Sequence, residues 1–258
     1  MSRDHSGKGA PMYGSATTSE ITLAVWTDGG ELTLYDSTQG ASMARDVPAA
    51  VFALAPERVR VISPHVGGGL GSKGSPRSQA VLAALAAREV DRPVKVALTR
   101  QQMFDVSGYR TPTIQRVRLG ADATGRLTAI AHDVVEQTSA ITEFAEQTAL
   151  PTRVMYAADA RRTSHRLVRL NVPTPSWMRA PGECPGMYAL ESAMDELAIA
   201  CGLDPIELRI RNEPDADPET GLPFSSRGLV ACLRAGAERF GWAGRDPAQG
   251  VRREGRCW

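Results

Sequence analysis

VGGGLGSKG, at residues 66–74, is the stretch of this 258-residue sequence that decides the fold. It follows a short strand predicted at residues 59–62, and residues 76–90 after it carry Ala, Leu and Val at helical spacing with Pro76 in the first turn. Consecutive glycines let backbone N–H groups approach an anionic or oxo-rich ligand that a Cβ atom would exclude. The sequence therefore predicts a ligand-facing loop between a strand and a helix.

Nucleotide-binding loops are the first alternatives for such a stretch. A Walker A loop needs Gly-Lys-Ser/Thr, whereas Ser72 precedes Lys73 here and Gly74 follows it. The pattern Gly69-x-Gly71-x-x-Gly74 does match the dinucleotide fingerprint in a strand-to-helix context. Against it, the turn from the strand is long, and Leu-Thr-Arg stands at residues 98–100, where an acidic residue would end the next strand. A dinucleotide-binding domain stays open as the alternative function.

Two hairpins are expected on either side of the loop. Residues 20–26 and 32–35 alternate apolar and polar side chains around Asp28-Gly29-Gly30. Residues 113–119 and 127–135 do the same around a turn at residues 122–125. The first hairpin lies before the glycine-rich loop and the second after it.

The predicted helices are short and separated by loops. Residues 42–54 have helical spacing, although Pro48 removes a backbone donor and is expected to kink the helix or break it in two. The other expectations are helices at 101–106, 186–201 and 228–240, a helix opened by Asp204-Pro205-Ile206-Glu207, and strands at 94–98 and 167–172, with residues 138–162 unassigned. Strands and helices mix without a steady strand–helix–strand rhythm, which favours an α+β fold.

Composition excludes several classes of partner. A formal net charge of +1 provides no field for nucleic acid or an anionic membrane, and the apolar run at residues 80–87 is too short to span a bilayer. No apolar signal segment precedes it, so we expect a cytoplasmic protein. The four cysteines and four histidines form no metal-binding pattern, and we expect reduced, structural thiols.

Four motifs in order resemble the molybdopterin-binding large subunit of molybdenum hydroxylases of the xanthine dehydrogenase and aldehyde oxidase type. They are Ser37-Thr38-Gln39, the glycine-rich loop, Trp-Met-Arg-Ala-Pro-Gly-Glu at residues 177–183, and Gly-Leu-Asp-Pro-Ile-Glu-Leu-Arg at residues 202–209. The resemblance spans residues 32–242. Met-Arg-Ala-Pro-Gly-Glu followed by Gly-Met-Tyr-Ala-Leu-Glu-Ser looks most like bacterial aldehyde-oxidising members.

The resemblance implies a set of cofactor-binding residues. Gln39 would donate its side-chain amide to an oxo or sulfido ligand of molybdenum, and Arg179 would place a cation beside the anionic cofactor. The backbone of Gly68, Gly69, Leu70 and Gly71 would lie against the metal and the pterin. The structural alternatives are a polar residue at a helix start for Gln39 and a surface ion pair for Arg179.

Three departures from the family pattern bear on activity. The family commonly has Phe where Leu70 stands, so substrate packing is expected to be looser. Purine-oxidising members carry Glu where this chain has Gly74, which disfavours purine. The activating carboxylate of the family lies in a Gly-x-Gly-Glu context that this sequence lacks, and Glu254 sits in a polar segment that would not raise its pKa.

These inferences predict the first molybdopterin-binding domain of a molybdenum hydroxylase, an α+β fold of mixed sheets and packed helices at residues 19–242, with a disordered leader at 1–18 and a basic tail at 243–258. The parent reaction would hydroxylate an aldehyde or N-heterocycle with water oxygen, using a molybdenum–molybdopterin cofactor with or without a cytosine dinucleotide extension. Iron–sulfur and FAD subunits, and a chain supplying the second molybdopterin domain, are the expected partners. The chain is expected to be a truncated product or one piece of a split subunit, inactive alone, with a non-catalytic remnant as a further alternative.

Overall fold

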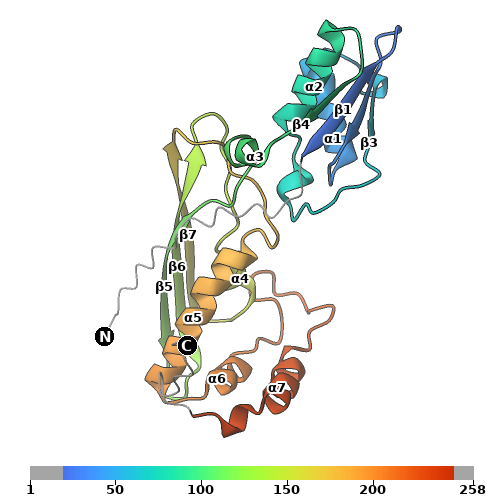
Figure 1. Cartoon of the computed structure of the whole chain (residues 1–258). Coiled ribbons are helices and arrows are strands. Elements are labelled where there is room, and N and C mark those ends of the chain that lie inside the picture. The colour runs from blue at the N-terminus through green and yellow to red at the C-terminus, as the bar shows by residue number, and fades with distance from the viewer. Residues whose placement is uncertain (1–19, 247–258) are drawn as a thin grey trace.

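The computed structural model describes residues 20–246, which form two lobes with different sheets (Figure 1). The N-terminal lobe contains strands β1 to β4 with helices α1 and α2. The C-terminal lobe contains β5 to β7 with α4 to α7, and the short helix α3 (Arg100–Val106) lies between the lobes. Mixed sheets with packed helices confirm the predicted α+β class. The leader at 1–18 and all of the tail beyond residue 246 lie outside the described residues.

The N-terminal sheet has the strand order β3-β2-β1-β4. Its strands are β1 (Ile21–Trp26), β2 (Leu32–Asp36), β3 (Val59–Ile62) and β4 (Val94–Ala97). The predicted first hairpin is confirmed, because β1 and β2 are antiparallel and Gly30, at φ 74°, closes the turn by donating to the carbonyl of Thr27. β2 and β3 are parallel, and β4 pairs antiparallel with β1.

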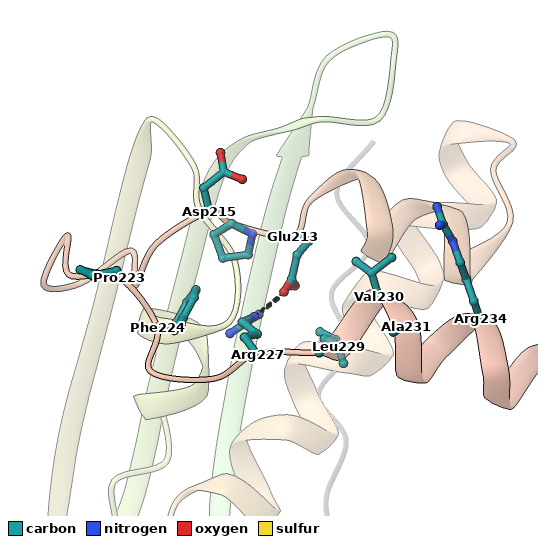
Figure 2. A pocket seen from close by; sticks show the side chains of 11 residues that line it. Glu213, Asp215, Pro223, Phe224, Arg227, Leu229, Val230, Ala231 and Arg234 are labelled. Atoms are coloured by element: carbon teal, nitrogen blue, oxygen red, sulfur yellow. Dashed lines mark hydrogen bonds and ion pairs between the residues drawn. The ribbon is translucent and has the colours of Figure 1, made fainter.

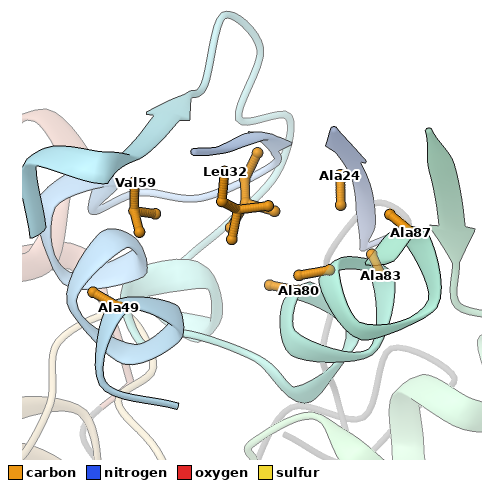
Figure 3. Close-up of a cluster of buried hydrophobic side chains, with 9 residues drawn as sticks. Ala24, Leu32, Ala49, Val59, Ala80, Ala83 and Ala87 are labelled. Carbon is orange, nitrogen blue, oxygen red and sulfur yellow. The ribbon is translucent and has the colours of Figure 1, made fainter. Parts of the chain in front are cut away.

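Helices α1 (Ala41–Val51) and α2 (Ser78–Glu89) pack on one face of this sheet, and small residues let them approach closely (Figure 3). From the strands, Ala24, Leu32 and Val59 enter the core, and from α2 a row of alanines meets them. That row is Ala80, Ala83, Ala84 and Ala87. Because alanine side chains are small, the helix backbone must lie close to the sheet for the core to be densely packed.

The expected break at Pro48 is wrong, since α1 continues through it from Ala41 to Val51. Pro48 cannot donate to the preceding turn, but Phe52 donates to the Pro48 carbonyl at 2.9 Å and the ladder resumes at once. The proline ring is buried on the same face of the helix as Ala44. Burial of the ring offsets the missing hydrogen bond.

The C-terminal sheet has the order β5-β6-β7. β5 (Thr113–Ala121) and β6 (Leu127–Ser139) form the second predicted hairpin, and β7 (Ala160–Leu170) pairs parallel with β6. The strand expected at 167–172 therefore begins earlier, inside the segment left unassigned. That segment also contains the short helix α4 (Leu150–Val154).

Helix α5 covers one face of the second sheet. α5 (Glu183–Cys201) lies along it and ends at Gly202, as predicted, and α6 (Pro205–Arg211) and α7 (Leu229–Phe240) follow. Asp204 caps α6 by accepting from the backbone N–H of Ile206 and Glu207, and its other oxygen accepts from Trp242 and Arg245. Three short 3-10 turns complete the described elements, at Pro56–Arg58, Ser72–Gly74 and Trp242–Gly244. None of the helices between residues 20 and 246 has the length and apolarity needed to cross a bilayer.

A buried histidine joins the second sheet to its helices. His132 on β6 is fully buried, with Thr152 Oγ1 2.7 Å from Nδ1 and Gln115 Oε1 3.0 Å from Nε2. Burial lowers the pKa of His132 to about 4; the nearby His165 acts in the same direction, and Asp133 opposes it. The folded protein therefore holds this ring neutral.

Overpacking the alanine row should destabilise the N-terminal lobe. We expect Ala83→Leu to lower the free energy of unfolding by about 1–3 kcal/mol, because the added side chain must displace the sheet or the helix. Urea unfolding followed by circular dichroism measures this change. Glu89→Leu, at an exposed position of the same helix, is the control. Equal stability of the two variants would contradict the packing described above.

Acid should weaken the fold through His132. Its folded-state pKa lies below the unfolded value, so its contribution is fully present above pH ~6.5 and is lost as the pH falls toward 4. Between pH 7 and pH 5 the protein should lose about 2 kcal/mol of unfolding free energy through His132. His132→Gln should lack this loss. Urea titrations at both pH values measure it, and the exposed His65→Gln is the control. An unchanged pH dependence in His132→Gln would refute the assignment.

Candidate cofactor-binding site

The two sequence motifs with ligand-binding character meet at the junction of the lobes. We call residues 66–74 the glycine loop and residues 174–182 the arginine loop. A Cβ atom added to Gly71 would lie 3.0 Å from the Trp177 carbonyl oxygen and 3.1 Å from the backbone of Met178. Gly71 also has φ 90°, which a side chain would strain. Glycine at this position therefore allows the two backbones to touch.

Gln39 lies over the glycine loop, between β2 and α1. Its backbone N–H donates to the Lys73 carbonyl at 2.9 Å, and its side-chain Oε1 accepts from the Gly71 N–H at 3.0 Å. A Cβ atom on Gly69 would clash with this carboxamide. Because an N–H must meet the oxygen of the amide, Nε2 is directed away from Gly71, and within residues 20–246 no acceptor is recorded for it. Gln39 is exposed and carries an available pair of N–H donors.

The alternative role for Gln39, a polar residue that caps a helix start, is not what the side chain does. The residue that precedes α1 is Gly40, and no side chain caps the helix there. Gln39 instead contributes its oxygen to the glycine loop.

The buried side chain of Lys73 connects the two ends of the glycine loop. It is buried, and its Nζ donates to Ser37 Oγ at 2.7 Å and to the Val66 carbonyl at 2.8 Å. Thr38 Oγ1 donates to the Lys73 carbonyl at 3.2 Å. Burial lowers the pKa of Lys73, and the carboxylates of nearby acidic residues oppose this. Lys73 thus ties both ends of the loop to the Ser37-Thr38-Gln39 segment.

Two residues without glycine's freedom adopt left-handed backbone in these loops. Leu70 has φ 49° and Ala180 has φ 57°. Such conformations cost on the order of 1 kcal/mol each and persist where surrounding contacts impose them. They occur here in the two loops whose amides and side chains face the same junction.

The arginine loop is held by two residues that sequence analysis did not single out. Arg110 donates from Nη2 to the Arg179 carbonyl at 2.5 Å and is ion-paired with Glu146. Glu146 has a fully buried side chain (0% exposed), and its Oε1 accepts from the Gly182 N–H at 3.1 Å. Burial raises the pKa of Glu146, while the Gly182 hydrogen bond and Arg110 oppose the rise. The backbone on both sides of Ala180 is therefore fastened from within.

This fastening leaves the side chain of Arg179 outside. Arg179 is exposed, and among residues 20–246 no acceptor or ion-pair partner is recorded for its guanidinium. The alternative of a surface ion pair has no support in the described part of the chain. Gly182, at φ 87°, is required where it stands because a Cβ atom would clash with the Gln147 carbonyl.

An apolar rim accompanies these polar groups. Leu70 is 44% exposed and Trp177 43% exposed, and Phe144 packs edge-on against Trp177 with ring centroids 6.0 Å apart. Met178 is half-buried. Leu70 and Trp177 are thus both half-exposed to solvent in this chain.

The alternative dinucleotide site finds no support in this geometry. A dinucleotide fingerprint leads directly into the first turn of a helix, whereas here Ser72–Gly74 is a 3-10 turn and α2 begins only at Ser78. The Gly71 N–H, which would face a pyrophosphate, donates to Gln39 instead. The sheet also has a single parallel pair, β2 with β3.

A separate hollow of about 610 Å³ lies between the segment after α6 and the first turns of α7 (Figure 2). Arg227 in its wall bonds to Glu213 and stacks over Phe224 at 4.4 Å. The charge of Arg227 is therefore satisfied within the protein. None of the residues expected to contact the cofactor lines this hollow.

Comparisons with known proteins agree on one family. Residues 16–213 match the family model of the molybdopterin cofactor-binding domain. The aldehyde oxidoreductase molybdenum-binding subunit PaoC of Escherichia coli K12 is 44% identical over 90% of this chain and 32% of its own length. The putative xanthine dehydrogenase molybdenum-binding subunit XdhA of the same organism is 32% identical over 87% of this chain and 31% of its own length.

Solved structures agree with this match. The aldehyde oxidoreductase of Desulfovibrio gigas has a TM-score of 0.78 at 28% identity, covering 87% of this chain and 25% of that chain. Quinoline 2-oxidoreductase of Pseudomonas putida 86, at 22% identity, shares the fold with a TM-score of 0.80, covering 90% of this chain and 31% of that chain. The chain spans about a third of the length of the first curated relatives it matches.

Removing Arg110 should damage the arginine loop by stranding a buried carboxylate. We expect Arg110→Met to lower the free energy of unfolding by about 3–5 kcal/mol, and Arg110→Met with Glu146→Gln to cost less than the sum of the two single changes. Urea unfolding of the four proteins completes the double-mutant cycle. Strict additivity would mean that the two side chains do not depend on each other. Arg118→Met, on the exposed surface of β5, is the control.

Proposed function

Because this chain belongs to the molybdopterin cofactor-binding domain family, we propose that it forms one wall of the molybdenum–molybdopterin site of an aldehyde- or N-heterocycle-oxidising hydroxylase. The observation that carries the proposal is the set of unused donors at the loop junction. The Gln39 amide and the Arg179 guanidinium, one from each lobe, lie exposed on either side of the contact between Gly71 and Met178. Donors without acceptors suit an anionic, oxygen-rich ligand.

The residues fit such a cofactor on two structural grounds. Glycine at position 69 lets the Gln39 carboxamide lie directly against the loop, because a Cβ atom there would clash with Gln39 Oε1. Gln39 cannot turn its oxygen outward without breaking its bond to Gly71, so it would offer N–H groups to the bound cofactor. When bound, the cofactor supplies the two-electron redox chemistry of hydroxylation with water oxygen.

Each residue would act on the bound cofactor by position and charge. Gln39 would donate to a terminal ligand of the metal, and Arg179 would offset the negative charge of the dithiolene side. The backbone of Gly68, Gly69, Leu70 and Gly71 would support the pterin. Arg179 would act from a fixed backbone, because Arg110 binds the Arg179 carbonyl and Glu146 binds the Gly182 N–H.

We favour an aldehyde over a purine as substrate. The identity to an aldehyde oxidoreductase subunit supports this class, and Gly74 takes the place of the glutamate that the resemblance associates with purine. Leu70, half-exposed beside Trp177, would leave an apolar opening without an aromatic wall.

Turnover would need groups from elsewhere. The activating carboxylate expected for the family is not assigned to any residue of this chain, so we propose that a second molybdopterin domain supplies it and that the chain alone is inactive. Iron–sulfur and FAD subunits would accept the electrons.

Reconstitution with isolated molybdopterin cofactor tests the proposal. We expect the cofactor to raise the melting temperature of the chain, because it binds the folded state alone, and we expect NAD to leave it unchanged. Arg179→Ala and Gln39→Ala should each weaken binding by roughly tenfold or more, the cost of a hydrogen bond to a charged group. Molybdenum retained after gel filtration, measured by mass spectrometry, gives the affinity ranking.

Arg60→Ala is the matched control, since Arg60 is exposed on β3 within the same lobe as Gln39. It should bind the cofactor like the unaltered chain. If Arg60→Ala and Arg179→Ala lose equal amounts of molybdenum, Arg179 is only a surface charge. A melting temperature that responds to NAD and not to the cofactor would overturn the family function.

A further inference from the structure

Arg77 lies outside the residues that the family resemblance assigns, yet it contacts both loops of the site. It immediately precedes α2, and its Nη2 donates to the Ser72 carbonyl, with Ser72 Oγ at 3.3 Å. The same nitrogen lies 3.2 Å from Ser176 Oγ, in the arginine loop of the other lobe. The Arg77 guanidinium therefore bonds to Ser72, five positions earlier in the sequence, and to Ser176, 99 positions later.

Arg77 is nearly buried and is ion-paired with an acidic side chain. Its side chain is 11% exposed and lies 3.8 Å from the carboxylate of Glu20, which is 1% exposed. A Cβ atom on Gly108 would clash with Ser176 Oγ and would come within 2.9 Å of Arg77 Nη1. Glycine in the linker between α3 and β5 thus leaves room for the guanidinium and the serine hydroxyl to meet.

Burying this cation costs free energy that its interactions with neighbouring groups must offset. A desolvated ion pair adds little net stability compared with an apolar pair of the same size. A guanidinium, however, offers several donors in one rigid plane, so it can fix the geometry between two separate segments. Here those segments are the glycine loop and the arginine loop, which touch nearby at Gly71 and Trp177.

We propose that Arg77, held by Glu20, is a positioning residue that sets the spacing between the glycine loop and the arginine loop. It fastens Ser72 and Ser176 to one rigid group, so Gln39 and Arg179 keep a constant separation across the junction of the lobes. The structural part of this inference stands by itself. Its consequence for ligand binding rests on the proposed function.

Hydrogen exchange of the chain without cofactor tests the structural part. Arg77→Met removes the donors and keeps the apolar stem, and Arg77→Lys keeps a charge without the planar fork. We expect amides in residues 66–74 and 174–182 to exchange roughly tenfold faster in both variants, while the protection of β6 and α5 stays unchanged. Glu20→Gln should have the same pattern with a smaller increase.

Arg88→Met on α2 is the control for a merely structural arginine, because Arg88 stacks over Trp26 and Phe52 away from both loops. It should leave exchange in the two loops unchanged. Acceleration of exchange throughout Arg77→Met, or no acceleration in the arginine loop, would overturn the inference. Full restoration of loop protection in Arg77→Lys would also overturn it, since a single ammonium would then suffice.

Binding of isolated molybdopterin cofactor separates this inference from the proposed function. We expect Arg77→Lys to bind the cofactor at least about fivefold more weakly although Gln39 and Arg179 are intact. If exchange accelerates only in the two loops but the unaltered chain binds no cofactor, the positioning role stands and the cofactor site is rejected. Unchanged affinity in Arg77→Lys, with cofactor bound by the unaltered chain, would reject the positioning role and leave the cofactor site standing.

Discussion

The close approach of two backbones, at Gly71 and at Trp177–Met178, is the constraint on which the site depends. Each lobe has its own core, and the small alanines under the first sheet and the larger Leu190 and Met194 under the second belong to separate clusters. The junction between them is therefore made of loops. Glycine without a Cβ atom, in a left-handed conformation, lets the loops touch where any other residue would force them apart.

Buried polar groups then give these loops a defined shape. Lys73 closes the glycine loop, while Arg110 and Glu146 hold the backbone of the arginine loop. Each of these charges is removed from water and bonded to backbone atoms, so a small displacement would leave it unsatisfied. The same arrangement leaves the Gln39 Nε2 group and the Arg179 guanidinium exposed, and we propose that these donors face the ligand. The buried charged residues thus bond within the protein, whereas neighbouring residues expose their donors at the surface.

The relatives of this chain are longer proteins. They are about three times as long, so their corresponding domain is one part of a larger subunit. Leu70 and Trp177 are half-exposed in this chain, and we propose that a cofactor or a second domain covers them. The exposed apolar rim and the unused donors both lie at the junction of the lobes and form one surface.

Local signals in the sequence determined most of the elements and the four motifs. Turn residues, helical spacing and the cap at Asp204 act within a few positions, so both hairpins and the helices after residue 182 were predicted correctly. Only the tertiary structure decided that α1 passes through Pro48, that β7 begins at Ala160, and which charges hold the loops. Residues 160–166 lack apolar alternation, and pairing with β6 makes them a strand. Arg110 bonds to Glu146 across 36 positions and Arg77 to Ser176 across 99, distances at which no periodic or local pattern links two residues, because their pairing arises from the folding of the whole chain.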